Sequence, residues 1–129
     1  MWPFGKRKNN ALPHHLQVGR TGEDAACRAL WKRGYRIVER NFRSGNDEVD
    51  IIAEKSRVIY FVEVKTRSDA ADPEAALEAV DEGKRGRIRN AARNYLAHFD
   101  TQDVESRFKV ITVSLDEKLK TRDIRLFEE

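Results

Sequence analysis

The sequence has a single cysteine, Cys27, among 129 residues, so it can form neither an intramolecular disulfide nor a cysteine-rich zinc site. We therefore expect a reducing compartment, and the cytoplasm is the predicted location. No apolar run approaches the length of a membrane span, and no apolar stretch follows the basic N-terminal residues as a signal peptide requires. We accordingly expect no membrane partner.

A large excess of one charge sign is also missing, because 25 Lys and Arg residues stand against 22 Asp and Glu residues, giving a net charge of +3. Charged residues make up 36% of the chain and apolar residues 40%, which excludes wholesale disorder and is typical of a soluble domain with a charged surface. The small positive excess is a weak indication of a polyanionic partner. Function therefore has to be inferred from the arrangement of residues.

The first 17 residues contain two of the three prolines and a basic cluster at positions 6–8, with no helical or strand period. They predict a mobile basic N-terminal arm (1–17) in front of one domain (18–129). A helix is expected from an N-cap at Thr21 to a stop at Gly34, followed by a strand at 35–40 and an irregular stretch at 41–47.

Further elements follow in the second half of the chain. A short helical piece is expected from Asp72, and a longer helix from Asp81 to about Phe99 has apolar residues at helical spacing. Strands are expected at 108–115 and 124–127. The order of helix, strand, hairpin, helix, strand and strand predicts an α/β fold with a mixed sheet flanked by helices.

A hairpin lies at the centre of the chain, with alternating strands at 48–54 and 58–67 and a polar loop at 54–57. If Ala53 pairs with Val58, Asp50 lies opposite Phe61. Any register that keeps the apolar face together also gathers the polar side chains on the other face, because side chains alternate along strands. That face carries three carboxylates and an ammonium: Glu48, Asp50, Glu63 and Lys65.

Such clustered carboxylates indicate a possible metal site. Like charges opposite one another destabilise a sheet, and a divalent cation with oxygen ligands removes the repulsion. Asp50 and Glu63 could bind Mg²⁺ with the Val64 carbonyl, and Lys65 could position the attacking water in phosphodiester cleavage. The residues alone fit a structural ion-pair cluster equally well.

Arginines recur every four residues on the long helix, beside a lysine at its start. This stripe either contacts phosphates or forms an ordinary solvated face. The candidate nucleic-acid contacts are Lys84, Arg85, Arg89 and Arg93, with Arg67 after the hairpin.

Several motifs together resemble the YraN-like family of small bacterial proteins. They are Gly22-Glu23-Asp24-Ala25-Ala26, Asn41-Phe42-Arg43, Glu48-Val-Asp50-Ile-Ile, Phe61-Val-Glu63-Val-Lys65-Thr-Arg67, Lys84 and Ala91-Ala92-x-x-Tyr95-Leu96. That family resembles the PD-(D/E)XK nucleases, which include restriction endonucleases and Holliday junction resolvases. The resemblance implies a restriction-endonuclease-like αβββαβ core.

The same resemblance implies roles for individual residues. Asp50, Glu63, Lys65 and Glu23 stand where the superfamily has its catalytic residues, and Glu48 stands as a third metal ligand or a supporting acid beside Asp50 and Glu63. The sequence departs from the family at Val49, where the superfamily has proline, at Asp47, where glycine is usual, and at Lys109, where aspartate is usual.

The sequence thus predicts a Mg²⁺- or Mn²⁺-dependent endonuclease that acts on nucleic acid, with DNA expected and branched DNA a candidate substrate. A homodimer would suit a two-fold symmetric substrate. A non-catalytic nucleic-acid-binding or accessory protein with the same fold is one alternative. A structural charged cluster in an interaction module is the other.

Overall fold

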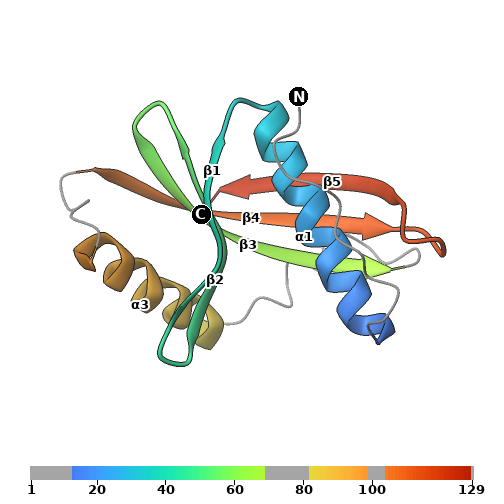
Figure 1. Ribbon diagram of the computed structural model, residues 1–129, viewed down its shortest axis with the longest axis horizontal. Helices are drawn as coiled ribbons and strands as arrows, with labels where there is room; N and C mark the ends of the chain where they lie inside the picture. Colours follow the sequence, from blue (N-terminus) through green and yellow to red (C-terminus); the bar gives the residue numbers. More distant parts are fainter. Residues whose placement is uncertain (1–12, 69–81, 99–103, 129) are drawn as a thin grey trace.

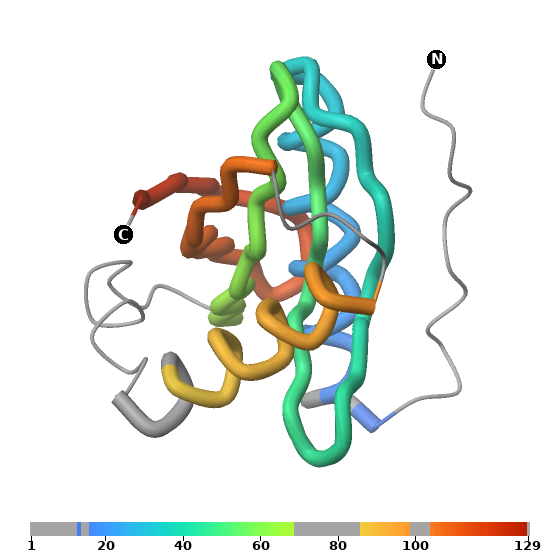
Figure 2. Tube along the Cα trace, turned by 90° about the vertical axis from the view of Figure 1, so that its left-hand side faces the viewer, coloured from blue at the N-terminus to red at the C-terminus, as the bar shows by residue number. Residues whose placement is uncertain are grey.

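The computed structural model describes residues 13–68, 82–98 and 104–128, without the side chains of residues 14, 15 and 82–85. Five strands form one sheet in chain order, and Figures 1 and 2 show a helix on each of its faces. The elements are α1 (His14–Lys32), β1 (Arg36–Ser44), β2 (Asp47–Lys55), β3 (Val58–Ser68), α3 (Glu82–His98), β4 (Glu105–Leu115) and β5 (Thr121–Glu128).

The sheet is mixed, because β3 and β4 run parallel whereas the other neighbouring strands are antiparallel. A parallel pair needs a crossover connection, and α3 lies within it. This arrangement of five strands and two helices is consistent with a restriction-endonuclease-like core, so the predicted α/β fold is confirmed.

Both faces of the sheet carry a hydrophobic core. The core under α1 contains Leu30, Ile51 and Val62, and the core under α3 contains Ile52 and Phe61. The hairpin face that the sequence assigned to carboxylates is therefore half apolar, because α3 covers one end of it. The polar side chains gather at the other end of the hairpin, beyond Ile51.

The turn between β2 and β3 is shorter than predicted. Ser56 and Arg57 have positive φ angles of 51° and 66°, as a two-residue type I′ hairpin turn requires. Lys55 therefore pairs with Val58, and the predicted pairing of Ala53 with Val58 is wrong by two residues. A shift of two does not by itself exchange the two faces of the strands.

A change of face occurs where β1 passes Asn41. Arg40 pairs with Ile51, whose side chain lies in the α1 core, but Phe42 pairs with Val49, whose side chain lies in the α3 core. Asn41 between them has a left-handed φ of 55°, which interrupts the usual alternation. The expectation that Val49 and Ile51 share one face is therefore wrong.

Helix α1 begins earlier than the predicted N-cap at Thr21. Pro13 occupies the N-cap position, and its carbonyl accepts hydrogen bonds from the N–H groups of Leu16 and Gln17. Val18 packs against the α1 core, so burial extends the helix through this turn. Residues 14–17 of the predicted arm are thus helical, and residues 1–12 lie outside the described residues.

The remaining predicted elements agree with the structure to different degrees. The long helix is confirmed as α3, and strands β4 and β5 extend beyond their predicted bounds at 108–115 and 124–127. The short helical piece from Asp72 lies outside the described residues.

Gly22 allows α1 to lie directly against β3. A Cβ atom at this position would overlap the side chain of Thr66, whereas a Cβ at Gly19 would have no atom within 4 Å. The close approach brings the next residue, Glu23, to the polar end of the hairpin.

We expect Gly22→Ala to destabilise the fold by about 1–3 kcal/mol, because the new methyl group must push α1 away from β3. Gly19→Ala is the matched control on the same helix and should be neutral, or stabilising by up to about 1 kcal/mol, because alanine is the better helix former. Urea denaturation of both variants measures the difference. Equal stabilities would show that the helix does not depend on this contact.

Candidate functional site

The site begins where β2 separates from β3. Their ladder ends with the pairing of Ile51 with Val62. One residue further, the side chain of Asp50 takes up the position of a strand partner, because its Oδ2 atom accepts a hydrogen bond of 2.8 Å from the Val64 N–H. Asp50 is thereby fixed in the fork between the two strands.

Glu63 provides a second buried carboxylate beside Asp50. Glu63 is 3% exposed, and its carboxylate lies close enough to Asp50 to affect the pKa of that group. Burial, followed by the charge of Glu63, raises the pKa of Asp50 to about 8, although the Val64 hydrogen bond acts in the opposite direction. At neutral pH the protein alone therefore holds a proton on this pair of carboxylates.

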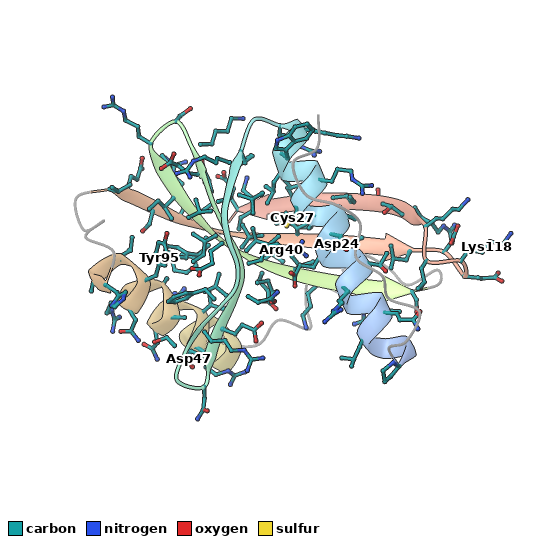
Figure 3. The ribbon with its side chains drawn as sticks, viewed as in Figure 1. Asp24, Cys27, Arg40, Asp47, Tyr95 and Lys118 are labelled. Carbon is teal, nitrogen blue, oxygen red and sulfur yellow. The ribbon has the colours of Figure 1, made fainter. Side chains whose placement is uncertain are left out.

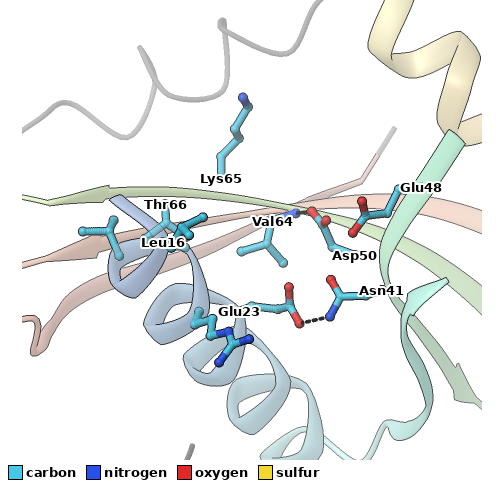
Figure 4. Close-up of a pocket in the computed structure, with 11 residues that line it drawn as sticks. Leu16, Glu23, Asn41, Glu48, Asp50, Val64, Lys65 and Thr66 are labelled. Atoms are coloured by element: carbon cyan, nitrogen blue, oxygen red, sulfur yellow. Dashed lines mark hydrogen bonds between the residues drawn. The ribbon is translucent and has the colours of Figure 1, made fainter. Parts of the chain in front are cut away.

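A pocket of about 410 Å³ opens beside this pair, between α1 and the hairpin. Figure 4 shows Glu48 and Asp50 on one side of it, with Glu23 and Asn41 reaching in from α1 and β1. Glu48 also lies 3.5 Å from the guanidinium of Arg43, an ion pair at the surface. The predicted acidic residues are thus brought to one region, with Glu63 joined to it through Asp50.

Glu23 is held by two residues that the sequence analysis missed. Arg40 donates two hydrogen bonds to Glu23 Oε1, at 3.0 and 2.8 Å, and Asn41 donates a third at 3.0 Å. Arg40 also contacts Asp24 at 2.6 Å, and Figure 3 shows the two residues together. In the sequence, Arg40 resembles any surface arginine of a half-buried strand. The one signal that could have indicated its role is the Asn41-Phe42-Arg43 motif that follows it.

Lys65 lines the same pocket but has a different direction. Side chains alternate along β3, so Val64 and Thr66 lie toward α1 and Lys65 lies toward the opposite face. Figure 4 accordingly shows the Lys65 side chain extending away from Glu23. The fold brings the lysine to the rim of the pocket, with its ammonium turned away from Glu23.

The predicted nucleic-acid contacts are described in part. Arg89 and Arg93 are exposed on α3, and Arg67 is exposed near the end of β3. The side chains of Lys84 and Arg85 lie outside the described residues. What is described of the stripe faces solvent, where phosphates could reach it.

The donor set suits a hard cation. Among the described side chains, no three from His, Cys, Asp and Glu are grouped closely enough to hold a metal by themselves, so Asp50, Glu63 and Glu48 do not form a ready three-ligand cluster. Magnesium commonly uses one or two carboxylates and completes its shell with water and substrate phosphate. The contacting carboxylates of Asp50 and Glu63 fit that pattern, and oxygen ligands favour Mg²⁺ or Mn²⁺ over zinc.

Comparison with known proteins covers most of this chain. The model of the uncharacterised protein family UPF0102 matches residues 22–113, which include the whole carboxylate region. This chain belongs to the UPF0102 family. No helix in the described part of this UPF0102 chain is long and apolar enough to cross a membrane.

Individual relatives show the same extent of similarity. A UPF0102 protein of Chloroherpeton thalassium is 43% identical over 80% of this chain and 79% of its own length. One from Koribacter versatilis is 44% identical over 81% of this chain and 73% of its own length. One from Oleidesulfovibrio alaskensis is 40% identical over 86% of this chain, which covers 54% of that longer protein.

We expect Asp50→Asn to stabilise the fold at pH 8. In wild type the folded state holds a proton on Asp50 that the unfolded chain, with the usual pKa of 3.8, releases. The free energy of unfolding should therefore fall as pH rises from about 4 to about 8. Asparagine can still accept from Val64 and carries no charge, so the variant should escape this loss.

The difference between Asp50→Asn and wild type should be small near pH 4 and reach a few kcal/mol at pH 8, as measured by urea denaturation across this range. Asp123→Asn, which removes a carboxylate in an exposed ion pair with Arg125, is the control and should show no such trend. If Asp50→Asn were less stable than wild type at pH 8, the inference that the buried carboxylates of Asp50 and Glu63 repel each other would be contradicted.

Proposed function

We propose that this chain is a Mg²⁺- or Mn²⁺-dependent nucleic-acid endonuclease of the PD-(D/E)XK type. The observation that carries the proposal is the proximity of buried Glu63 to Asp50, which lines a pocket together with Glu23, Glu48 and Lys65. Burial and the neighbouring charge of Glu63 raise the pKa of Asp50, and groups perturbed in this way are typical of functional sites.

Asp50 and Glu63 would hold the cation, which when bound supplies positive charge to polarise a phosphodiester. Binding it displaces the proton that the pair retains at neutral pH, because a nearby positive charge favours the ionised carboxylates. Glu23 and Glu48 would orient water at the pocket wall. The residues therefore supply a negative anchor and acceptors for protons from an attacking water.

Lys65 would contact the substrate phosphate from the rim of the pocket. Its side chain must rotate toward the carboxylates to do so, a movement that exposed side chains make within nanoseconds. There its ammonium would offset the charge that develops during cleavage.

The basic residues suggest the substrate class. Arg89 and Arg93 on α3 and Arg67 on β3 would contact phosphates, with Lys84 and Arg85 extending the same stripe. Phosphate contacts confer affinity with little base discrimination, so selection would rest on substrate shape. We propose DNA, with branched DNA and a homodimeric enzyme as the specific forms to test.

A non-catalytic nucleic-acid-binding protein is the second candidate. The observation that favours it is the direction of Lys65, whose ammonium is turned away from Glu23. Such a protein would bind branched DNA without cleaving it at any metal concentration.

The decisive experiment incubates purified protein with single-stranded, flapped and four-way DNA at low salt, with Mg²⁺ or Mn²⁺. We expect metal-dependent nicking that Asp50→Ala and Lys65→Ala each reduce by at least about a hundredfold, as is usual when a group acting on the transition state is removed. Asp123→Ala, at an exposed carboxylate on β5, is the matched control and should leave nicking unchanged.

Calorimetric titration with Mn²⁺ separates the remaining outcomes. Binding that Asp50→Asn abolishes, without nicking by wild type, would favour the non-catalytic candidate. The absence of Mn²⁺ binding by wild type would leave a structural charged cluster and would overturn the endonuclease proposal.

The proposed DNA surface on α3 has its own test. Arg89→Ala/Arg93→Ala should weaken DNA binding and flatten the dependence of log K on log salt by up to about 2, because two phosphate contacts are lost. Arg87→Ala, also exposed on α3 but off the stripe, is the control. Fluorescence anisotropy at several salt concentrations measures both, and equal slopes would place the DNA elsewhere.

A further inference from the structure

Three hydrogen bonds converge on one oxygen atom of Glu23. The Arg40 Nε and Nη2 atoms and the Asn41 Nδ2 atom all donate to Oε1, at 3.0, 2.8 and 3.0 Å. Figure 4 shows the bond from Asn41 and the second oxygen of Glu23 on the side of Val64 and Asp50. A carboxylate bound in this way has a defined rotation about its last bond.

The two donors reach Glu23 because of the backbone at Asn41. Consecutive residues of a strand normally point to opposite faces, so Arg40 and Asn41 could not both reach the same side chain of α1. The left-handed φ of 55° at Asn41 breaks the alternation, and asparagine tolerates this conformation better than most residues. A local departure from strand geometry thus delivers both donors to one oxygen.

The charges and the burial of Arg40 and its two acidic partners leave a negative charge beside the pocket. The Arg40 and Glu23 side chains are 14% and 13% exposed, so the pair is largely desolvated. Arg40 also pairs with Asp24, and one guanidinium with two carboxylates leaves a net charge of −1.

We propose that Arg40 and Asn41 are positioning residues that fix Glu23 toward the water shell of the cation held by Asp50 and Glu63. This inference rests on the proposed function. Neither residue touches the cation or substrate; they act through Glu23, by holding one oxygen so that the other points into the pocket. Loss of either donor lets the carboxylate rotate and weakens its contribution to cation binding.

The test measures Mn²⁺ affinity by calorimetry, and nicking as a function of Mn²⁺ concentration. Changing a residue that orients a ligand typically costs 10–100-fold in metal affinity, so we expect Arg40→Gln to weaken Mn²⁺ binding by about tenfold. Asn41→Ala should have a smaller effect in the same direction. Excess Mn²⁺ should restore nicking by both variants but not by Asp50→Ala.

Two controls separate positioning from general stabilisation. Arg36→Gln removes another β1 arginine, whose ion pair with Glu54 is exposed, and should leave Mn²⁺ affinity unchanged. Asp24→Asn removes the other partner of Arg40 and should lower the melting temperature without changing Mn²⁺ affinity. A double-mutant cycle completes the set, because Arg40→Gln should add nothing to the loss caused by Glu23→Gln if it acts through Glu23.

The outcomes are distinct. If wild type binds Mn²⁺ through Asp50 but Arg40→Gln and Asn41→Ala retain full affinity, the positioning role is overturned and the proposed function stands. Additive losses in the double-mutant cycle would overturn it as well. If Arg40→Gln does not fold, Asn41→Gly, which removes the same donor and keeps the left-handed backbone without strain, decides alone. Wild type that binds no Mn²⁺ overturns both proposals.

Discussion

The separation of β2 from β3 after Ile51 and Val62 is the constraint on which the site depends. Once the strands part, the N–H of Val64 is bonded by a side chain, and Asp50 is the residue that reaches it. That bond fixes a carboxylate against Glu63, in a position where burial and charge both oppose ionisation. The pocket, the approach of α1 to β3 and the ion pair of Arg40 with Glu23 are all arranged around Asp50.

The sequence predicted the elements well and the details of the site less well. Helix α3 followed from its apolar period, and alternation predicted Asp50 together with Glu63, although in the structure the hydrogen bond from Val64 fixes Asp50 beyond the end of the ladder. The register itself depended on Ser56 and Arg57, which adopt positive φ angles although neither is glycine. No composition signal marks such a turn.

What could not be predicted arises from irregular backbone and tertiary contacts. The register shift between Ile37 and Glu39 and the change of face at Asn41 have no periodic signature, and together they place Arg40 and Asn41 against α1. The early start of α1 depends on packing of Val18, which a local capping signal at Thr21 obscured. The direction of Lys65 follows from a sheet covered on both faces, whereas the sequence suggested one apolar and one polar face.

The position of the acidic groups along the chain has a consequence for synthesis on the ribosome. Glu23, Asp50 and Glu63 all emerge before the segment that forms β4, so the edge of β3 that β4 later covers is open in the nascent chain. An open apolar edge is a template for aggregation, and charged side chains near it discourage pairing with other chains. The charged residues Glu63 and Lys65 of β3 would therefore also discourage such pairing until translation completes the sheet.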